Sequence, residues 1–140
     1  MDLIKARKVV EDFFKKCNFA HQIEVKQNHI HAKASNITLK GIDDDIAVTI
    51  GVFENGSMFI EFIFDKIKKL EKAADAINNL NQSFPFTKAY VTESGYFTVC
   101  YSVLNVETTE AVNKTIYDIF NIVGDDVFIN ALQKVTKLTK

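Results

Sequence analysis

The segment Val52-Phe53-Glu54-Asn55-Gly56-Ser57-Met58 carries the clearest structural signal in this chain. It joins two runs of alternating apolar residues, and Asn-Gly between such runs is the strongest short-range signal for a β-hairpin. A two-residue loop would place the apolar side chains of the two strands on opposite faces. A three-residue loop, 54–56, pairs Val52 with Met58 and places them on one face. Because a one-residue slip turns a whole set of side chains over, we predict the second register, with a bulge at Gly56 in the left-handed conformation.

The hairpin and the segment that follows it recur along the chain. Residues 52–81 and 91–120 correspond at a constant offset of 39, so that Gly56 corresponds to Gly95 and the predicted hairpin is repeated. Each hairpin leads into a segment with helical periodicity. Two explanations stay open: an internal duplication, or the shared physical demands on any hairpin that is followed by a helix.

The other elements follow from apolar periodicity and from capping residues. They are a helix over 2–17, alternating strands at 22–26, 30–34 and 46–52, a loop at 41–45, a helix over 66–81 capped by Asp65, a helix running from Asn105 to Gly124, and a last helix from Asp125 or Asp126. The result is one α+β domain over 1–140, with ββα pseudo-repeats at about 46–83 and 87–123. We expect an antiparallel sheet with helices mainly on one face, in the order α-β-β-β-α-β-β-α-α.

Composition and charge argue against several classes of function. The chain has 140 residues, a formal net charge of −1 and Arg7 as its single arginine, a poor match to a nucleic-acid partner. No run of about 18 apolar residues exists, so we expect a cytoplasmic protein with no membrane contact. Cys17 and Cys100 are then expected to be free thiols, packed as small hydrophobic residues.

No motif for catalysis or for a cofactor stands out. The five glycines are far apart and none forms a phosphate loop. His29 and His31 share a strand face and could bind a metal ion with carboxylates from 43–45. We favour a solvated hairpin face beside an acidic loop, because nothing else in the chain has the spacing of metal ligands. Cys17 and His21 form a conceivable nucleophile and base with no third group to orient them. We therefore expect a protein that is not an enzyme and that has no catalytic, cofactor or metal site.

The sheet face opposite the predicted core is unusually apolar. Five of its residues form our candidate protein-binding site: Phe53, Phe59, Ile63, Tyr96 and Cys100. A face with this much apolar surface is usually covered. The cover is either the first or last helix of the chain itself, or a partner protein or a second copy.

The second half of the chain resembles the bacterial YbjN-like family, whose fold is shared with type III secretion chaperones. The resemblance covers about 46–123 and rests on runs of sequence. These are Ala74-Asp75-Ala76-Ile77-Asn78-Asn79-Leu80-Asn81, then Pro85-Phe86-Thr87-Lys88-Ala89-Tyr90-Val91, then Glu93-Ser94-Gly95-Tyr96, and Thr108-Thr109-Glu110 opening a helix. It implies a non-enzymatic, often dimeric, protein-binding domain of regulatory or chaperone type, and it implies no catalytic residues.

The sequence therefore leads to one functional hypothesis with one alternative. The hypothesis is a cytoplasmic protein-binding module that presents a sheet face or edge to a protein partner or to a second copy of itself. The alternative is a small-molecule-binding domain with an apolar pocket between the sheet and the C-terminal helices.

Overall fold

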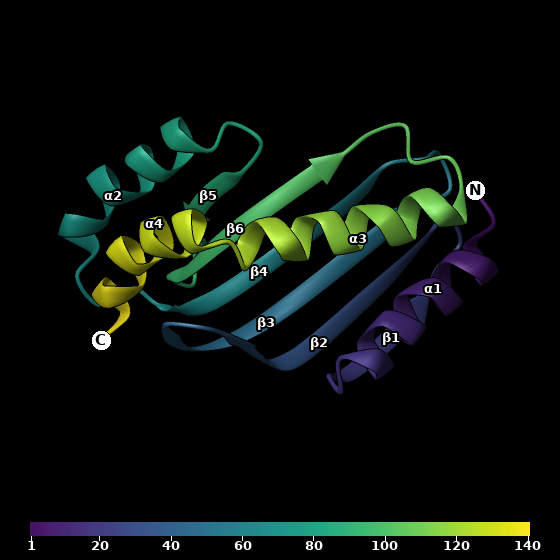
Figure 1. Ribbon diagram of the computed structural model, residues 1–140, viewed down its shortest axis with the longest axis horizontal. Helices are drawn as coiled ribbons and strands as arrows, with labels where there is room; N and C mark the ends of the chain where they lie inside the picture. The colour runs from purple at the N-terminus through teal and green to yellow at the C-terminus, as the bar shows by residue number, and fades with distance from the viewer.

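The computed structural model describes residues 1–140 as four α-helices and six β-strands (Figure 1). In chain order these are α1 (Leu3–Lys16), β1 (Ala20–Val25), β2 (His29–Leu39), β3 (Ile42–Phe53), β4 (Met58–Lys66), α2 (Leu70–Ser83), β5 (Lys88–Val91), β6 (Tyr96–Val103), α3 (Thr109–Val123) and α4 (Asp126–Thr136), with a final 3₁₀ turn, Lys137–Thr139. The predicted α+β class and element order are confirmed. One strand is added, since four strands stand between α1 and α2 where the predicted order has three.

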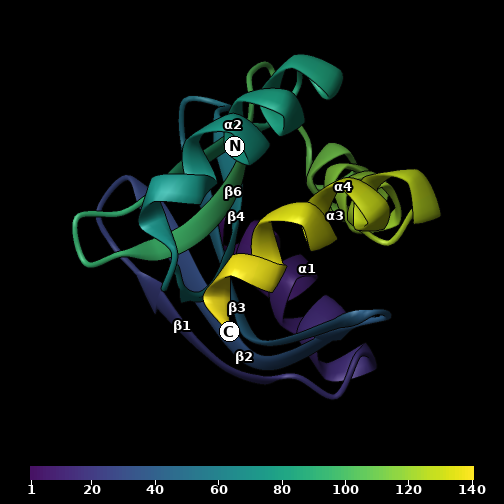
Figure 2. The same ribbon diagram turned by 90° about the vertical axis from the view of Figure 1, so that its left-hand side faces the viewer.

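The six strands form one antiparallel sheet in the order β1-β2-β3-β4-β6-β5. The helices gather on one side of this sheet, and its other side carries no helix (Figure 2). The predicted placement of the helices mainly on one face is therefore confirmed. The first and last helices both pack on the core side, so neither covers the second face.

Both hairpins have the register that the parity of their apolar residues predicts. Val52 pairs with Met58, the N–H of Phe53 donates to the carbonyl of Ser57 at 2.9 Å, and Gly56 has a φ of 89°. In the second hairpin Gly95 has a φ of 92°, which a residue with a side chain rarely adopts. The left-handed bulge thus recurs at the repeated glycine.

The two hairpins lie next to each other because β4 pairs with β6. Ile60 pairs with Tyr101, and Glu61 pairs with Cys100, which is its own equivalent at the offset of 39. A pair of equivalent residues facing each other across two antiparallel strands marks a local twofold axis normal to the sheet. The sequence repeat is therefore a spatial repeat in these two strands.

The core lies between the sheet and the helices, and phenylalanine supplies much of it. Alternate residues of β3, β4 and β6 point into this layer, as period-two alternation requires. The largest fully buried side chains include Phe14, Phe62, Phe64, Phe97 and Phe128. Burial of such a side chain stabilises the fold by roughly 1.5–3 kcal/mol.

Helix α2 begins later than predicted and has no side-chain cap. Its first residue is Leu70, and Asp65, the predicted cap, belongs to β4. Strand β4 is prolonged because Lys66 pairs with Tyr96 and the N–H of Asp65 donates to the Asp44 carboxylate at 3.1 Å. Leu70, which the periodicity places on the buried stripe, is exposed.

The predicted loop at 41–45 is largely strand. A tight turn at Gly41, where φ is 83°, brings Leu39 opposite Ile42, and β3 then runs from Ile42. Asp44 is buried on the core side of this strand. Its carboxylate accepts hydrogen bonds from the Thr139 hydroxyl at 3.0 Å and pairs with Lys140 Nζ at 3.2 Å. Contacts with the distant C-terminus therefore overcome the low strand propensity of aspartate.

Helix α3 is capped by Thr108 instead of Asn105. The Thr108 hydroxyl accepts from the N–H of Ala111 at 3.1 Å. Asn105 has a φ of 62°, and the next residue, Val106, donates its N–H to the carbonyl of Gly56 at 2.7 Å. This loop-to-hairpin contact delays the start of the helix by a few residues.

Candidate protein-binding face

All five predicted site residues lie on the face of the sheet that has no helix. Phe53, Phe59, Ile63 and Cys100 are half-buried, and Tyr96 is 38% exposed. The structure brings Phe53 and Phe59 into ring contact, with centroids 6.2 Å apart. Ile63 and Tyr96 lie further along β4 and β6, separated from this contact by polar residues. We call this side of the sheet the open face.

Two histidines extend the aromatic part of the open face. The ring of His29 stacks on Phe53, with centroids 4.8 Å apart and planes 17° from parallel. The ring of His31 lies 6.4 Å from Phe59. These four residues, from β2, β3 and β4, form the aromatic cluster.

A glycine creates the space that the aromatic cluster needs. Gly51 pairs with Phe59 across β3 and β4, and a Cβ at Gly51 would lie 2.2 Å from Phe59 Cε1. The Phe59 ring therefore lies flat over the backbone of Gly51, and aromatic cover of a strand glycine is a recognised way to stabilise a sheet. The ring is held down on the sheet and its outer side is left exposed.

The middle of the open face carries one polar pair. The Tyr90 hydroxyl donates to Glu61 Oε2 at 3.1 Å, from β5 to β4 across the intervening strand. Burial, together with the nearby Glu61 carboxylate, raises the pKa of Tyr90 to about 12. Burial also raises the pKa of the neighbouring Cys100 thiol, which keeps it protonated and unreactive at neutral pH.

At the end of the open face, Lys66 Nζ lies 5.2 Å from the centroid of the Tyr96 ring, within the range of a cation–π contact. The face therefore changes character along its strands. It is aromatic near the β3–β4 turn and polar with isolated apolar groups elsewhere.

Sequence reasoning missed three members of this face: His29 and His31 as partners of the phenylalanines, and Tyr90. The registers His29 with Phe53 and His31 with Gly51 depend on the β2–β3 pairing. No turn motif comparable to Asn55-Gly56 fixes that pairing in the sequence. Tyr90 lies on a strand of four residues, too short for alternation to assign its face with certainty.

The candidate reactive groups do not come together. The structure contains no group of three His, Cys, Asp or Glu side chains arranged to bind a metal ion. The rings of His29 and His31 belong to the aromatic cluster. The Asp44 carboxylate contacts the Thr139 hydroxyl and Lys140. Cys17 is largely exposed at the end of α1, and its partial burial raises the pKa of its thiol although the nearby Lys16 ammonium acts in the opposite direction.

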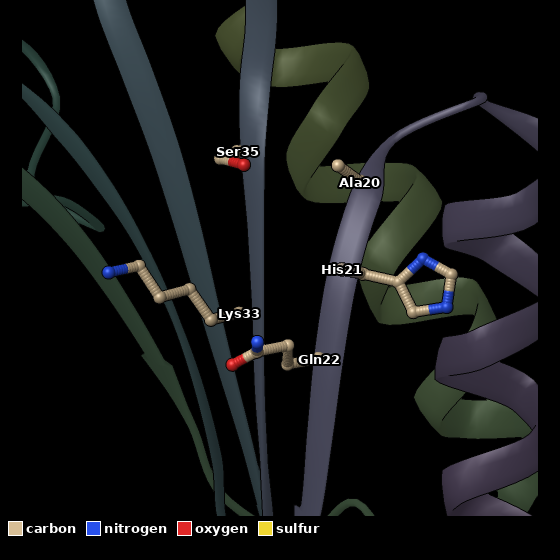
Figure 3. A pocket seen from close by; sticks show the side chains of 5 residues that line it. All are labelled: Ala20, His21, Gln22, Lys33 and Ser35. Atoms are coloured by element: carbon tan, nitrogen blue, oxygen red, sulfur yellow. The ribbon is translucent and has the colours of Figure 1, made fainter.

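The hollows of the surface are shallow and open to solvent. One of about 360 Å³ lies at the β1–β2 edge and is lined by Ala20, His21, Gln22, Lys33 and Ser35. Figure 3 shows that His21 projects from β1 toward α1, while Lys33 projects away from it on the far side of β2. Another hollow, of about 280 Å³, lies between the end of α2 and the α3–α4 turn and includes Phe84, Ile122 and Phe128.

Comparison with known proteins gives no match: no family model, no curated protein and no solved structure is similar to this chain. The resemblance to the YbjN-like family therefore stays a prediction. Among the helices, none combines the length and the apolar character needed to cross a membrane.

Proposed function

We propose that this chain is a non-enzymatic, cytoplasmic protein-binding module of chaperone-like or regulatory type, and that it binds its partners through the open face. The observation that supports this proposal is the aromatic cluster on a sheet face that no helix of the chain covers. Surface aromatic residues around a partly desolvated centre are typical of binding hot spots.

The geometry of the cluster favours a protein surface over a small molecule as its occupant. The Phe53 and Phe59 rings lie on a sheet, and the small hollow beside them, lined by Asn28, Phe53, Glu54 and Asn55, measures about 280 Å³. Small-molecule sites usually enclose most of the ligand. A flat aromatic surface with a polar rim instead fits a complementary flat or convex protein surface.

The experiment compares lysine substitutions of the half-buried Phe59 and the exposed Val127 in affinity capture, with the captured proteins quantified by mass spectrometry. Phe59→Lys places a charge in the aromatic cluster, whereas Val127→Lys places the same charge on α4, where Val127 is 67% exposed. We expect the partners that bind wild type and Val127→Lys to be recovered with Phe59→Lys in amounts at least tenfold lower. This corresponds to a loss of about 1.4 kcal/mol in binding free energy. Equal recovery with the two variants would contradict the proposal. Circular dichroism of both variants is the control that checks whether each is folded.

A second candidate function, small-molecule binding, is favoured by one further observation. The hollow between α2 and the α3–α4 turn is lined by Phe84 and Phe128, and the Phe128 ring lies 6.4 Å from Tyr101, whose buried hydroxyl has no hydrogen-bond partner. Titration with anilinonaphthalene sulfonate tests this site. The alternative requires saturable fluorescence that Ile122→Lys abolishes and Phe59→Lys leaves unchanged, and the absence of such a signal contradicts it.

A further inference from the structure

The two edges of the sheet are treated differently by the chain. At the β5 edge, the side-chain amide of Asn81 binds both main-chain groups of Ala89. Asn81 Oδ1 accepts from the Ala89 N–H at 2.7 Å, and Nδ2 donates to the Ala89 carbonyl at 3.0 Å. A side chain from α2 thus occupies the outward hydrogen-bonding groups of Ala89 in this four-residue edge strand, and cover of an edge is one way in which proteins prevent strand addition.

The β1 edge has no such cover. The N–H of Lys26 donates to the carbonyl of His29 at 2.8 Å, which fixes the phase of the β1–β2 ladder. Because bonded and non-bonded pairs alternate in antiparallel strands, the main-chain groups of His21, Ile23 and Val25 point away from β2. No hydrogen bond from another element reaches them. Val25 also has a 53% exposed side chain.

The side chains of β1 make this edge complementary to itself. If a second copy adds antiparallel with Ile23 opposite its own equivalent, His21 lies opposite Val25 and Gln22 lies opposite Glu24. The main-chain groups of His21, Ile23 and Val25 all point away from β2, so each of these residues then faces a residue of the second copy whose main-chain groups point toward it. The three pairs give about six main-chain hydrogen bonds. The apolar Ile23 and Val25 side chains lie together on the helix side of the joined sheet.

The charges on the other side of the strands favour the same register. Lys33 lines the hollow at this edge and takes part in no ion pair of the structure. Since Lys33 pairs with Gln22, the second copy's Glu24 would lie two strands away, about 10 Å between Cα atoms, which the two long side chains can span. Within one copy, Glu24 has only an exposed pair with Lys26 at 3.8 Å.

We propose that β1 is the edge at which a second copy of this chain adds, joining two sheets into one twelve-stranded sheet with Ile23 on the twofold axis. The axis is normal to the sheet, so both open faces lie on the same side and form one continuous binding surface. The inference rests on the proposed function, because it supplies the second copy of a protein-binding module.

The test is solution mass by light scattering over a concentration series of the full chain. Wild type is expected to shift from monomer to dimer as its concentration rises, and Ile23→Pro is expected to stay a monomer. Proline at this position removes an outward N–H that the β1–β2 ladder does not use. Ile23→Lys gives a second variant that keeps the backbone donor and places two like charges opposite each other.

A charge exchange tests the register without touching the core. Lys33→Glu and Glu24→Lys are each expected to raise the dimer dissociation constant about fivefold. Each replaces the attraction between Lys33 and the second copy's Glu24 by a repulsion between two like charges at an exposed position. The double variant should return it to within about twofold of wild type. A wild type that stays monomeric, or a dimer that survives Ile23→Pro and Ile23→Lys, overturns the inference.

Phe59→Lys separates this inference from the proposed function. The edge dimer should persist in that variant, because Phe59 lies on the open face and away from β1. A dimer that Phe59→Lys disrupts places the second copy on the open face, which overturns the edge inference and leaves the proposed function intact. A loss of partner capture without a loss of dimer leaves both standing.

Discussion

The ring of Phe59 occupies the space in which a side chain at Gly51 would have to stand, with Phe59 Cε1 2.2 Å from the position of a Cβ. Replacement of Gly51 therefore acts on the open face while leaving the core in place. Gly51→Val should lift the Phe59 ring from the sheet and change the free energy of unfolding by less than about 1 kcal/mol, since the gain in strand propensity offsets the lost packing. Urea unfolding and the aromatic NMR shifts of Phe59 measure the two effects.

Gly95 provides the matched control for Gly51. A Cβ at Gly95 would meet nothing within 4 Å, but its φ of 92° is unfavourable for any residue with a side chain. Gly95→Ala should therefore cost about 1–2 kcal/mol without disturbing the aromatic cluster. If Gly51→Val proves as destabilising as Gly95→Ala and leaves the Phe59 shifts unchanged, the described packing of Phe59 on Gly51 is incorrect.

The two tyrosines with raised pKa values should respond oppositely to loss of the hydroxyl group. Tyr101 is 4% exposed and its hydroxyl has no partner, whereas the Tyr90 hydroxyl donates to Glu61. Tyr101→Phe should raise the free energy of unfolding by about 0.5–1 kcal/mol, and Tyr90→Phe should lower it by about the same amount. Chemical denaturation of both variants measures the two changes in the free energy of unfolding. A destabilised Tyr101→Phe variant would mean that the Tyr101 hydroxyl has a hydrogen-bond partner.

Tyr90 should also make the stability depend on pH in the alkaline range. Burial and Glu61 raise its pKa in the folded chain from 10.0 to about 12. The folded state then keeps a proton that the unfolded state has lost, so this contribution is fully present below about pH 10 and disappears as the pH rises toward about 12. The difference in melting temperature between wild type and Tyr90→Phe should shrink over that interval. A constant difference would show that Tyr90 titrates normally.

Asp44 should be the one aspartate of its segment that matters for stability. Its carboxylate binds the Thr139 hydroxyl, Lys140 and the N–H of Asp65, and its side chain is fully buried. Asp44→Ala should cost about 1–3 kcal/mol because the part-buried N–H of Asp65 loses its acceptor and Lys140 loses its ion-pair partner, while the Thr139 hydroxyl keeps the Thr136 carbonyl at 2.6 Å. Asp43→Ala, at the exposed position between the buried residues Ile42 and Asp44, should cost less than about 0.5 kcal/mol. Equal effects in urea unfolding would mean that the C-terminal contacts with Asp44 do not form in solution.

The parts of the fold that follow from local pattern were predictable. The register at Val52 and Met58 follows from parity, because the opposite register exposes a whole apolar set. The Asp2 and Asp125 caps follow from residue type and are confirmed. The position of the five site residues on the open face follows from the same alternation, and the sequence left open only whether a helix covers them.

The features that sequence reasoning missed all depend on contacts between distant segments. Asp44 enters the strand because Thr139 and Lys140 reach it from the other end of the chain. Helix α3 starts at Thr109 because Val106 is bound by Gly56. The stacking of His29 on Phe53 follows from a β2–β3 register that bulges modify. None of these contacts leaves a periodic signal in the sequence.

The measurement that tests the open face most directly is site-specific photo-cross-linking in cells that express the protein. A benzoylphenylalanine replaces Phe59 in one version and Val127 in the other, and both are irradiated. We expect discrete cross-linked species from position 59, containing partner proteins, and none of comparable yield from position 127. Cross-links that arise from position 127 and are absent from position 59 would contradict the proposal that the open face is the binding surface.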